Sequence, residues 1–361
     1  MNDSSFKKDN AYNICFSLDD EYCHNLAVAI LSILSNSSPD ESFNFFILDG
    51  GISAESKLKI ETLKLVKNFN IQYVEVNKND FSNCPLIKDR NENYKDYHVT
   101  IPTYFRFELA SLFLDLDKIL YLDPDILVLK SLKDIMSIEL NDNYAAMVLD
   151  AETDKESSRL GLSGYYNAGI MLVNLKKWRE DNIQQKLFET TERIKNTILW
   201  QDQDVMNILF EHHILELDSC WNFQFFLYDS SQRDQMLENL YKYNIIHFAG
   251  LHKPLMRDFD HPLFYEYYDY LAKTPWRYLL LQMKQNQANE MKNEIKKIYD
   301  YVEKLIFDSN YHLKSSVDAE LHHMWGDLDK VYKYIEEKNQ EFTVNLNALK
   351  DGVQEQTKQL D

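Results

Sequence analysis

The sequence predicts an α/β fold, in which a parallel sheet is flanked by helices and followed by a helical appendage. Before residue 77 it contains three short apolar segments, 12–18, 43–48 and 71–76, separated by two amphipathic helical segments. Strands that alternate with helices in this way form βαβ units, whose strands run parallel. From residue 279 onward the apolar residues follow heptad-like spacing, which is typical of a helical hairpin or coiled coil.

The N-terminal elements follow from apolar spacing and from their caps. After the strand at 12–18, apolar residues recur at helical intervals up to Leu34, and no glycine-rich turn of the dinucleotide-binding type joins the two elements. Residues 53–68 form a charged amphipathic segment, and we expect its helix to begin at Ser53, a favoured N-cap. The polar stretch 77–98 is predicted to be a loop near the ligand face of the sheet.

The middle of the chain alternates in the same way. Residues 101–113 are predicted to form a helix with Pro102 in its first turn, where proline is tolerated. A further helix is expected to open at Leu175, and another shortly after Trp200. Apolar runs predict strands at 119–122, 144–149, 170–174 and 245–247.

The composition excludes some classes of protein. With 361 residues, of which 45% are hydrophobic, the chain is long enough for one large domain or for a catalytic domain with an appendage. Its net charge of −19 argues against a nucleic-acid partner, because phosphate binding requires clustered Lys and Arg. The four cysteines are scattered, which indicates a reducing compartment. Since no signal peptide or membrane-spanning run is evident, we expect a cytoplasmic protein.

The segment 119–129, ILYLDPDILVL, combines apolar runs with two carboxylates. Pro124 cannot donate a hydrogen bond within a sheet, so the strand is expected to end where the acidic residues begin. Asp123 and Asp125 would then lie at the carboxyl end of a strand, where open α/β sheets bind their ligands. Carboxylate oxygens suit Mg²⁺ or Mn²⁺, and such a metal usually carries a phosphate. We therefore expect a metal-bridged diphosphate site.

An Asp-x-Asp pattern is weak evidence by itself. It also occurs at 115–117 and 202–204, and the alternative explanation is a polar turn that follows a strand. However, acidic residues recur at the carboxyl ends of the expected strands, at Asp19, Asp49, Asp123 and Asp150. This repeated placement predicts an acidic edge of the sheet that accommodates a metal ion.

Other polar residues stand out from apolar surroundings. Arg106 lies in the segment 101–113, where it either meets a phosphate or extends to solvent. Asn167 lies between small residues, which allow a ligand to approach the backbone closely. His247 ends an expected strand, and a neutral imidazole can complete a metal site formed by two carboxylates. Lys253 follows it and can supply a positive charge to a phosphate.

Six motifs occur in a consistent order: SLDDEY (17–22), HVTIPTYFR (98–106), YLDPDILV (121–128), YYNAGIMLVNLKKW (165–178), QDQDVMN (201–207) and HFAGLHKP (247–254). Together they resemble the family 8 retaining glycosyltransferases, whose Rossmann-like GT-A fold binds nucleotide sugars. This fold implies a mixed, mainly parallel sheet flanked by helices. Within this family, the chain most resembles bacterial galactosyl- and glucosyltransferases that build lipopolysaccharide or surface glycans. The resemblance implies a glycosyltransferase domain at 1–275, followed by a helical, coiled-coil-like region at 276–361.

The resemblance implies a role for each matching residue. Asp123, Asp125 and His247 match the ligands of a Mn²⁺ ion, with Mg²⁺ as the alternative, that bridges the diphosphate of a UDP-hexose. The positions that bind this donor are matched by Asp19, Glu21, Arg106, Asn167, Asp202, Gly250 and Lys253. His98 and Asp150 resemble residues that face the acceptor and the transferred sugar. Glu21 and Leu255 depart from the family pattern, which affects the acceptor side more than the metal site.

The resemblance also implies that the sugar is transferred with retention of configuration. A covalent intermediate would require a carboxylate below the anomeric carbon. The matching residue is Gln203, whose amide is a poor nucleophile but whose carbonyl oxygen can stabilise a cationic sugar. We therefore expect front-face displacement, in which the leaving phosphate oxygen takes the acceptor's proton. Asp202 is the alternative nucleophile.

The region 276–361 has two candidate roles. Its apolar seams predict a homo-oligomer or docking to a partner protein. Alternatively, the apolar and aromatic residues that begin with Trp276 contact the inner face of a membrane peripherally, which is plausible for a lipid-linked acceptor. The acidity of the chain disfavours this second role.

Two other classes of protein are alternatives to a transferase. A haloacid-dehalogenase-type phosphatase also carries Asp-x-Asp after an apolar strand, but its motif lies near the first strand and normally has Thr or Val where this chain has Leu127. A coiled-coil scaffold without catalysis would account for 279–361 and leave the acidic residues at the strand ends unexplained.

Overall fold

A computed structural model describes residues 11–86, 99–224, 240–250, 253–255 and 262–308, together with most of 322–340. By its internal contacts the chain divides into two compact units, Met1–Trp276 and Arg277–Asp361. The assignment of 1–275 and 276–361 to separate domains stays a prediction.

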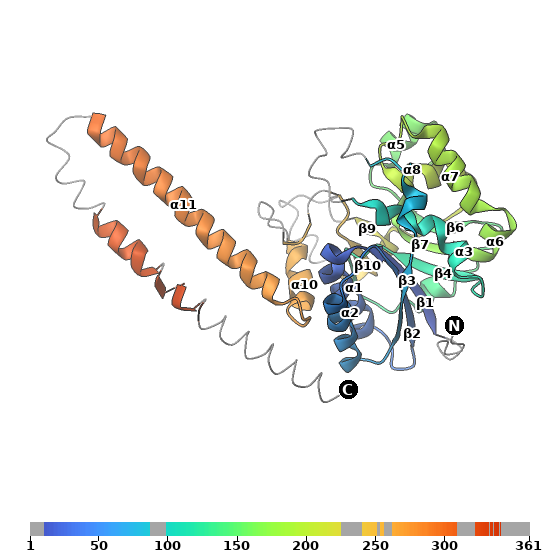
Figure 1. The fold of residues 1–361 in the computed structure, drawn as a ribbon, viewed down its shortest axis with the longest axis horizontal. Helices are drawn as coiled ribbons and strands as arrows, with labels where there is room; N and C mark the ends of the chain where they lie inside the picture. The colour runs from blue at the N-terminus through green and yellow to red at the C-terminus, as the bar shows by residue number, and fades with distance from the viewer. Residues whose placement is uncertain are drawn as a thin grey trace. The chain divides into compact units, whose positions relative to one another are not determined.

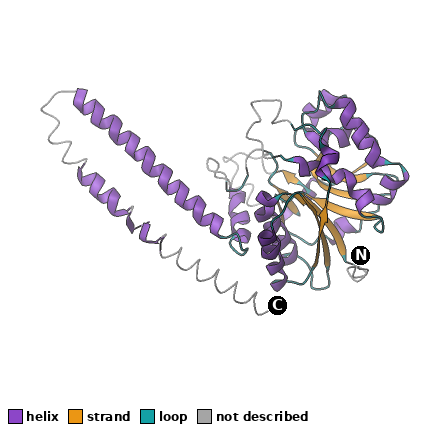
Figure 2. Ribbon diagram, in the orientation of Figure 1, coloured by secondary structure: helices purple, strands orange, loops and turns teal. Residues whose placement is uncertain are grey.

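A seven-stranded sheet forms the centre of the first unit (Figures 1 and 2). The order of its strands is β3-β2-β1-β4-β7-β6-β8. The first four of these run parallel, β7 is antiparallel to both of its neighbours, and β6 and β8 are parallel. The predicted mixed, mainly parallel sheet is therefore confirmed. The strands are β1 (Tyr12–Leu18), β2 (Phe43–Asp49), β3 (Asn70–Glu75), β4 (Lys118–Leu122), β6 (Ala145–Leu149), β7 (Tyr166–Asn174) and β8 (Ile214–Glu216).

A second sheet of three short strands positions the segment that the sequence emphasised. It consists of β5 (Ile126–Val128), β10 (Ile245–His247) and β9 (Phe223–Gln224), with β10 in the middle. The apolar run 119–129 is thus divided between the two sheets, and Asp123-Pro124-Asp125 connects them. The predicted end of the strand before the acidic residues is confirmed.

Helices cover both faces of the large sheet. In Figure 1, α1 and α2 lie on one side of it, and α3 and α6 lie on the other. In β4, every residue after Lys118 is buried, as expected for a strand covered on both faces. Among its described residues, the α-helices of this unit are α1 (Cys23–Ser35), α2 (Ala54–Glu61), α3 (Leu109–Leu112), α4 (Lys133–Met136), α5 (Thr153–Leu160), α6 (Leu175–Glu180), α7 (Ile183–Ile194), α8 (Gln201–Phe210) and α10 (Pro262–Leu271).

The helix expected at 53–68 is shorter than the sequence predicted. It begins as expected, because the Ser53 hydroxyl accepts a hydrogen bond from the backbone N–H of Ser56 at 3.1 Å. The α-helix ends at Glu61 and continues as a 3-10 turn, Thr62–Leu65. Tightening of the last turn in this way is common at the end of an α-helix.

The segment 101–113 and the strand expected at 170–174 also differ from the predictions. The first is a 3-10 helix, Ile101–Glu108, followed by the short α3. Five of the eight residues of this 3-10 helix are buried, so tertiary packing overrides the local preference for an α-helix. The strand begins at Tyr166, earlier than predicted, because β7 pairs with β6 as far as Tyr166.

The second unit contains a long helix, α11 (Tyr278–Asp308), and helical residues at 322–331 (orange and red in Figure 1). The rings of Tyr299 and Trp325 meet edge to face, with their centroids 5.0 Å apart. This contact joins the two helical segments, as in the predicted hairpin. A coiled coil stays a prediction.

Trp276 belongs to the packing of the first unit. Its side chain is buried, its backbone N–H donates to the Thr274 hydroxyl at 3.1 Å, and the ammonium of Lys59 lies 5.3 Å from its ring centroid. The buried Trp276 side chain is therefore not available for the predicted membrane contact, and contact by the residues that follow it stays a prediction.

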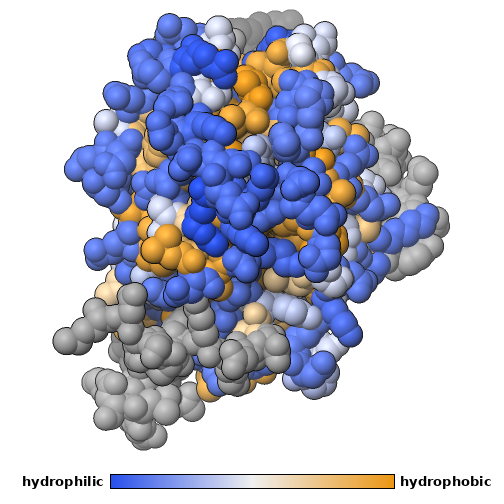
Figure 3. Space-filling model, turned by 90° about the vertical axis from the view of Figure 1, so that its right-hand side faces the viewer, coloured by the Kyte–Doolittle hydropathy of each residue, from blue (hydrophilic) through white to orange (hydrophobic). Residues whose placement is uncertain are grey.

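Among the residues described, none of the helices has the length and apolar character needed to cross a membrane. The face shown in Figure 3 is mostly hydrophilic, with hydrophobic residues in small patches.

Candidate active site

A cavity of about 520 Å³ lies where β1 and β4 end. This is the edge of the sheet at which the sequence predicted a ligand site. Segments that are far apart in the chain contribute its lining: 17–22, 99–106, 123–125, 150–156, 167–169, 200–203, 247–250 and Lys253.

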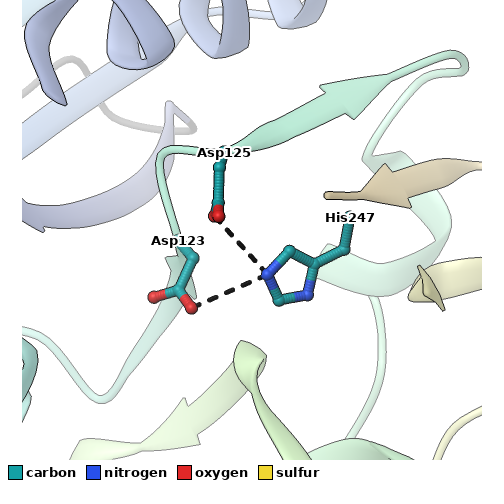
Figure 4. A group of neighbouring side chains, drawn as sticks. All are labelled: Asp123, Asp125 and His247. Carbon is teal, nitrogen blue, oxygen red and sulfur yellow. Dashed lines mark ion pairs between the residues drawn. The ribbon is translucent and has the colours of Figure 1, made fainter. Parts of the chain in front are cut away.

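Asp123, Asp125 and His247 converge at this cavity (Figure 4). One ligand atom from each lies within 4.8 Å of the other two. The His247 Nε2 atom is 3.5 Å from Asp125 Oδ1 and 3.8 Å from Asp123 Oδ2. The strand register explains the convergence, because β10 pairs with β5 so that His247 lies opposite Ile126, the neighbour of Asp125.

Gly169 provides the space that this cluster needs. A Cβ atom at this position would lie 2.2 Å from His247 Cε1 and 2.8 Å from Asp123 Oδ2. In addition, the Gly169 carbonyl accepts a hydrogen bond from the Asp123 backbone N–H at 2.7 Å. Gly169, two residues after Asn167, thus leaves room for the imidazole of His247 on β10.

Arg106 forms ion pairs with two carboxylates of the cavity lining, Asp123 and Asp202. Its guanidinium pairs with Asp123 Oδ1 at 2.8 Å and with Asp202 Oδ2 at 3.1 Å, and it donates to the Ala168 carbonyl at 2.6 Å. It also stacks on the Tyr121 ring, 4.1 Å from the centroid. Burial lowers the pKa of Arg106, but the surrounding carboxylates outweigh this effect and raise it. The alternative in which Arg106 extends to solvent is excluded.

Asp202 is a buried carboxyl at the start of α8. The Thr103 hydroxyl donates to its Oδ1 at 2.6 Å, and Arg106 pairs with its Oδ2. Burial raises the pKa of Asp202 to about 6, although Arg106 and the Thr103 hydrogen bond act in the opposite direction. Asp202 is thus a carboxyl that changes charge in a mildly acidic range.

Gln203, Asp150 and Asn167 form a second polar group at the cavity. The Gln203 carbonyl oxygen accepts from the Ala168 backbone N–H at 2.9 Å, and its amide nitrogen donates to Asp150 Oδ2 at 3.1 Å. The same Asp150 oxygen accepts from Asn167 Nδ2 at 3.0 Å. Asp150 thereby holds both amides in place, and both line the cavity beside it.

Lys253 lies directly beside the metal-site candidate. Its ammonium pairs with the Asp125 carboxylate and donates to the Phe248 carbonyl at 2.7 Å. Burial raises the pKa of the Asp125 carboxyl, but Lys253 and His247 outweigh burial and hold it well below its usual range. Asp125 is therefore an anion over the whole physiological range.

The other predicted residues divide into three groups. Asp19 and Gly250 line the cavity, as expected. Glu21 is exposed and does not line it, because the 3-10 turn Asp20–Tyr22 brings Tyr22 into the cavity instead. His98 lies outside the residues that the structure describes.

Asp49 is not part of the predicted acidic edge around the ligand site. Its carboxylate accepts hydrogen bonds from the backbone N–H groups of Gly51 and Ile52 and pairs with Lys57 at 2.6 Å. Burial raises its pKa, but these contacts outweigh burial and lower it. Asp49 therefore stabilises the turn before α2, which is a structural role.

Two residues at the site were not singled out by sequence analysis. Thr103 bonds to Asp202, and Asn222 Oδ1 lies 3.1 Å from His247 Nδ1. Thr103 carried no signal beyond its position in the HVTIPTYFR motif. Asn222 did carry one, since it is a polar residue between Trp221 and Phe223, and a polar residue with aromatic neighbours often has a buried partner.

The sequence matches the profile of Glycosyl transferase family 8 over residues 13–257, which is more than half of the chain. A Haemophilus influenzae protein that bears the name of a glycosyltransferase is 32% identical over 217 residues, which cover 58% of this chain and 63% of that protein. The lipopolysaccharide 1,3-galactosyltransferase of Salmonella typhimurium is 27% identical over 282 residues, which cover 75% of this chain and 80% of that enzyme.

Solved structures agree with this match. The galactosyltransferase LgtC, in complex with donor and acceptor sugar analogues, superposes with a TM-score of 0.63 and 29% identity, over 74% of this chain and 99% of LgtC. The glycosyltransferase GlyE of Streptococcus pneumoniae, at 22% identity and a TM-score of 0.52 over 74% of this chain and 63% of GlyE, shows the same fold. The chain therefore belongs to glycosyl transferase family 8 and has the GT-A fold.

Proposed function

We propose that this glycosyltransferase moves a hexose, galactose or glucose, from a UDP-sugar to a glycan, glycolipid or glycoprotein acceptor, with a divalent metal ion and with retention of configuration. The observation that supports this proposal most strongly is the convergence of Asp123, Asp125 and His247 at the cavity. Neither a phosphatase nor a scaffold accounts for a family match that spans residues 13–257.

The three converging residues fit a divalent cation. Their ligand atoms lie within 4.8 Å of one another, a spacing that one ion can bridge. Two carboxylates and one imidazole suit Mn²⁺, and Mg²⁺ is the alternative. When bound, such an ion would act as a Lewis acid that neutralises charge on the departing diphosphate. Lys253 would add a positive charge beside it, since its ammonium already lies against Asp125.

Asp19, at the end of β1, supports a nucleotide-binding role for the cavity. Its Oδ2 accepts a hydrogen bond from the Thr100 hydroxyl at 2.9 Å. Its Oδ1 is buried and, among the described residues, has no hydrogen-bond partner. A buried carboxylate oxygen without a partner is costly, and an N–H of the base or a hydroxyl of the ribose would satisfy it.

The arrangement around Gln203 favours front-face displacement over a covalent intermediate. The Gln203 amide is fixed at both ends by Ala168 and Asp150, so its carbonyl oxygen can present its second lone pair to a cationic sugar. Both oxygens of the alternative nucleophile, Asp202, are already engaged by Thr103 and Arg106. A carboxylate held in this way is a weaker nucleophile, and Asp202 instead positions Arg106.

The names of the relatives support a hexose donor. The Salmonella enzyme is a lipopolysaccharide 1,3-galactosyltransferase, and an Escherichia coli relative that is 27% identical over 282 residues is a lipopolysaccharide 1,2-glucosyltransferase. LgtC is a galactosyltransferase. We propose that this chain acts in the cytoplasm, at the inner face of the membrane if its acceptor is linked to a lipid.

Hydrolysis of a panel of nucleotide sugars tests the proposal. The purified protein, with Mn²⁺ and without acceptor, is expected to release UDP slowly from UDP-galactose or UDP-glucose, and not from GDP-mannose. EDTA should abolish this release, and Asp125→Asn should remove it. The matched control is Asp117→Asn, because the Asp117 side chain is 83% exposed and lies outside the cavity lining. UDP release that is unaffected by EDTA would contradict the metal-dependent function.

A further inference from the structure

A continuous chain of hydrogen bonds runs from Asp150 to the imidazole of His247. Asp150 Oδ2 accepts from Asn167 Nδ2 at 3.0 Å, and Asn167 Oδ1 accepts from Asn222 Nδ2 at 2.8 Å. Asn222 Oδ1 then lies 3.1 Å from His247 Nδ1. Asn167, Asn222 and His247 are all buried, so water does not compete for these bonds.

The contacts of Asn167 fix which groups donate and which accept along these hydrogen bonds. Asn167 Oδ1 also accepts from the backbone N–H of Gly169 at 3.0 Å, and a backbone N–H can only donate. The opposite side of the Asn167 amide faces Asp150 Oδ2, a carboxylate oxygen that accepts the hydrogen bond. Asn167 therefore presents its oxygen to Asn222, and Asn222 must donate its Nδ2 in return. This leaves Asn222 Oδ1, an acceptor, facing His247 Nδ1.

We propose that Asn222 is a positioning residue, which holds the proton of His247 on Nδ1 and so keeps the Nε2 lone pair directed at Asp123 and Asp125. This inference deepens the proposed function and rests on it, because it assumes that these three residues hold the metal ion. A ligating histidine needs a free ring nitrogen, and a hydrogen bond from the other nitrogen fixes which one that is.

The distances favour this tautomer over the reverse one. His247 Nδ1 is within hydrogen-bond distance of Asn222, whereas Nε2 is 3.5 and 3.8 Å from the carboxylate oxygens, longer than ordinary N–H···O bonds. Reversing the tautomer would turn the Asn222 amide and bring its oxygen against that of Asn167. Buried acceptors that are left without donors destabilise that arrangement.

The hydrogen-bond chain also links the metal-site candidate to the Gln203 amide, which is proposed to face the sugar. Asp150 Oδ2 accepts from Gln203 Nε2 as well as from Asn167. One carboxylate oxygen thus orients both Gln203 and, through two asparagines, His247. A change at Asn222 is therefore expected to affect metal affinity first, and the orientation of Gln203 only through Asp150.

Two measurements on the full-length protein test the proposal, and neither depends on transferase activity. Nitrogen-15 NMR of the metal-free protein, above the titration range of histidine, reports which ring nitrogen of His247 is protonated, and His247→Ala identifies the signal. Titration with Mn²⁺ alone measures metal affinity. We expect the Nδ1–H tautomer in the wild type. In Asn222→Leu this preference should be lost and Mn²⁺ affinity should fall by about 10–100-fold, as is typical for partners of ligating histidines.

Two further variants make the outcome specific. Asn222→Asp retains an acceptor for the Nδ1 proton, and although it loses the donor to Asn167 Oδ1, that oxygen keeps its hydrogen bond from the Gly169 N–H. It should therefore keep the wild-type tautomer and bind Mn²⁺ more tightly than Asn222→Leu does. Asn44→Leu is the matched control, since Asn44 is a buried amide in another chain of asparagines, between Asn13 and Asn70, outside the cavity lining. It should leave Mn²⁺ affinity unchanged.

The results that would overturn the proposal are distinct from those that would overturn the proposed function. A wild-type His247 protonated on Nε2, or a folded Asn222→Leu protein with wild-type Mn²⁺ affinity, contradicts the role of Asn222. If Asn222→Leu does not fold, the proposal is tested by the tautomer of His247 in the wild type and in Asn222→Asp. Loss of the Nδ1–H tautomer in a folded Asn222→Asp protein would contradict it. A wild-type protein that carries the Nδ1–H tautomer but binds no Mn²⁺ contradicts the metal-dependent function and leaves the hydrogen-bond chain intact.

Discussion

Two aspartates at the cavity have opposite electrostatic surroundings, although both are buried. The Lys253 ammonium outweighs burial and holds the pKa of Asp125 below its usual range, while burial raises the pKa of Asp202 to about 6 in spite of Arg106. The difference arises because the Lys253 ammonium pairs directly with Asp125, whereas Asp202 faces not only Arg106 but also the carboxylate of Asp123, which raises its pKa further. Asp125 is thus suited to bind a cation, and Asp202 is suited to hold Arg106 at neutral pH.

The raised pKa of Asp202 predicts a pH-dependent effect of Asp202→Asn on stability. Between the ordinary pKa of 3.8 and the folded value of about 6, the folded protein retains the proton more than the unfolded chain does. The contribution of Asp202 therefore favours folding at low pH and is lost as the pH rises through about 6. Relative to the wild type, the free energy of unfolding of Asp202→Asn should rise by at most about 3 kcal/mol from pH ~4 to pH ~7.

Urea unfolding of both proteins across this pH range measures the difference. Asp154→Asn serves as the control, because Asp154 is an exposed residue of the first turn of α5. A difference between Asp202→Asn and the wild type that does not change with pH would contradict the assignment of the raised pKa.

The glycine that admits His247 gives a second prediction at this scale. Gly169→Ala should weaken Mn²⁺ binding strongly, because the added Cβ would lie 2.2 Å from the His247 ring and force it away from Asp123. Overpacking of this kind typically costs about 1–3 kcal/mol of stability. Gly164→Ala is the control, since a Cβ there meets nothing closer than 3.4 Å. Equal Mn²⁺ affinities in the two variants would show that His247 is not confined by Gly169.

At the scale of elements, the site depends on the junction between two sheets. The sequence predicted the end of β4 correctly because Pro124 and two charged residues interrupt an apolar run. It could not predict the second sheet, because β5 pairs with β10 more than one hundred residues later. Short strands such as these depend on tertiary pairing, and their apolar residues carry no record of the partner strand.

The dependence on tertiary contacts also explains which site residues the sequence placed correctly. Asp123 and Asp125 follow a strongly apolar strand, so their position at its end could be read directly. Asp49 has the same local context, but a lysine in the next helix and two backbone N–H groups occupy its carboxylate. Glu21 points away because a 3-10 turn, which no sequence pattern marked, precedes α1. Local patterns locate strand ends but do not determine what each side chain contacts.

Arg106 joins the 3-10 helix Ile101–Glu108 to β4 and α8, which predicts a large loss of stability in Arg106→Met. The substitution leaves Asp123 and Asp202 without their shared cation. Loss of one partner from a buried ion pair typically costs about 3–5 kcal/mol. Added Mn²⁺ should restore part of this loss, because it compensates the charge of Asp123.

Thermal unfolding of Arg106→Met, with and without Mn²⁺, checks this prediction. The matched control is Arg179→Met, whose partner Asp117 is 83% exposed, and it should cost less than about 1 kcal/mol. Equal losses of stability in the two variants would show that the buried pairs do not stabilise the fold.

At the scale of the whole molecule, the two units are expected to contribute differently. All residues of the cavity lie in Met1–Trp276, and α11 lies in Arg277–Asp361. We expect a protein truncated after Arg277, which keeps the buried Trp276, to retain hydrolysis of UDP-sugars within about twofold and to lose any oligomer that the full chain forms.

Light scattering and the hydrolysis assay, applied to both proteins, test this division. Flotation with liposomes tests the alternative role of the second unit in membrane contact. A truncated protein that folds but no longer hydrolyses UDP-sugars would show that the second unit takes part in the reaction.

The central claim is that Asp123, Asp125 and His247 hold one divalent cation that serves a departing nucleotide diphosphate. An anomalous difference map of crystals grown with Mn²⁺ and UDP tests it most directly. The account predicts a single strong manganese peak within bonding distance of Asp123, Asp125 and His247 and of the diphosphate oxygens, about 2.0–2.3 Å from each ligand atom. A manganese peak elsewhere in the cavity, or UDP bound with no manganese between these three residues, would contradict it.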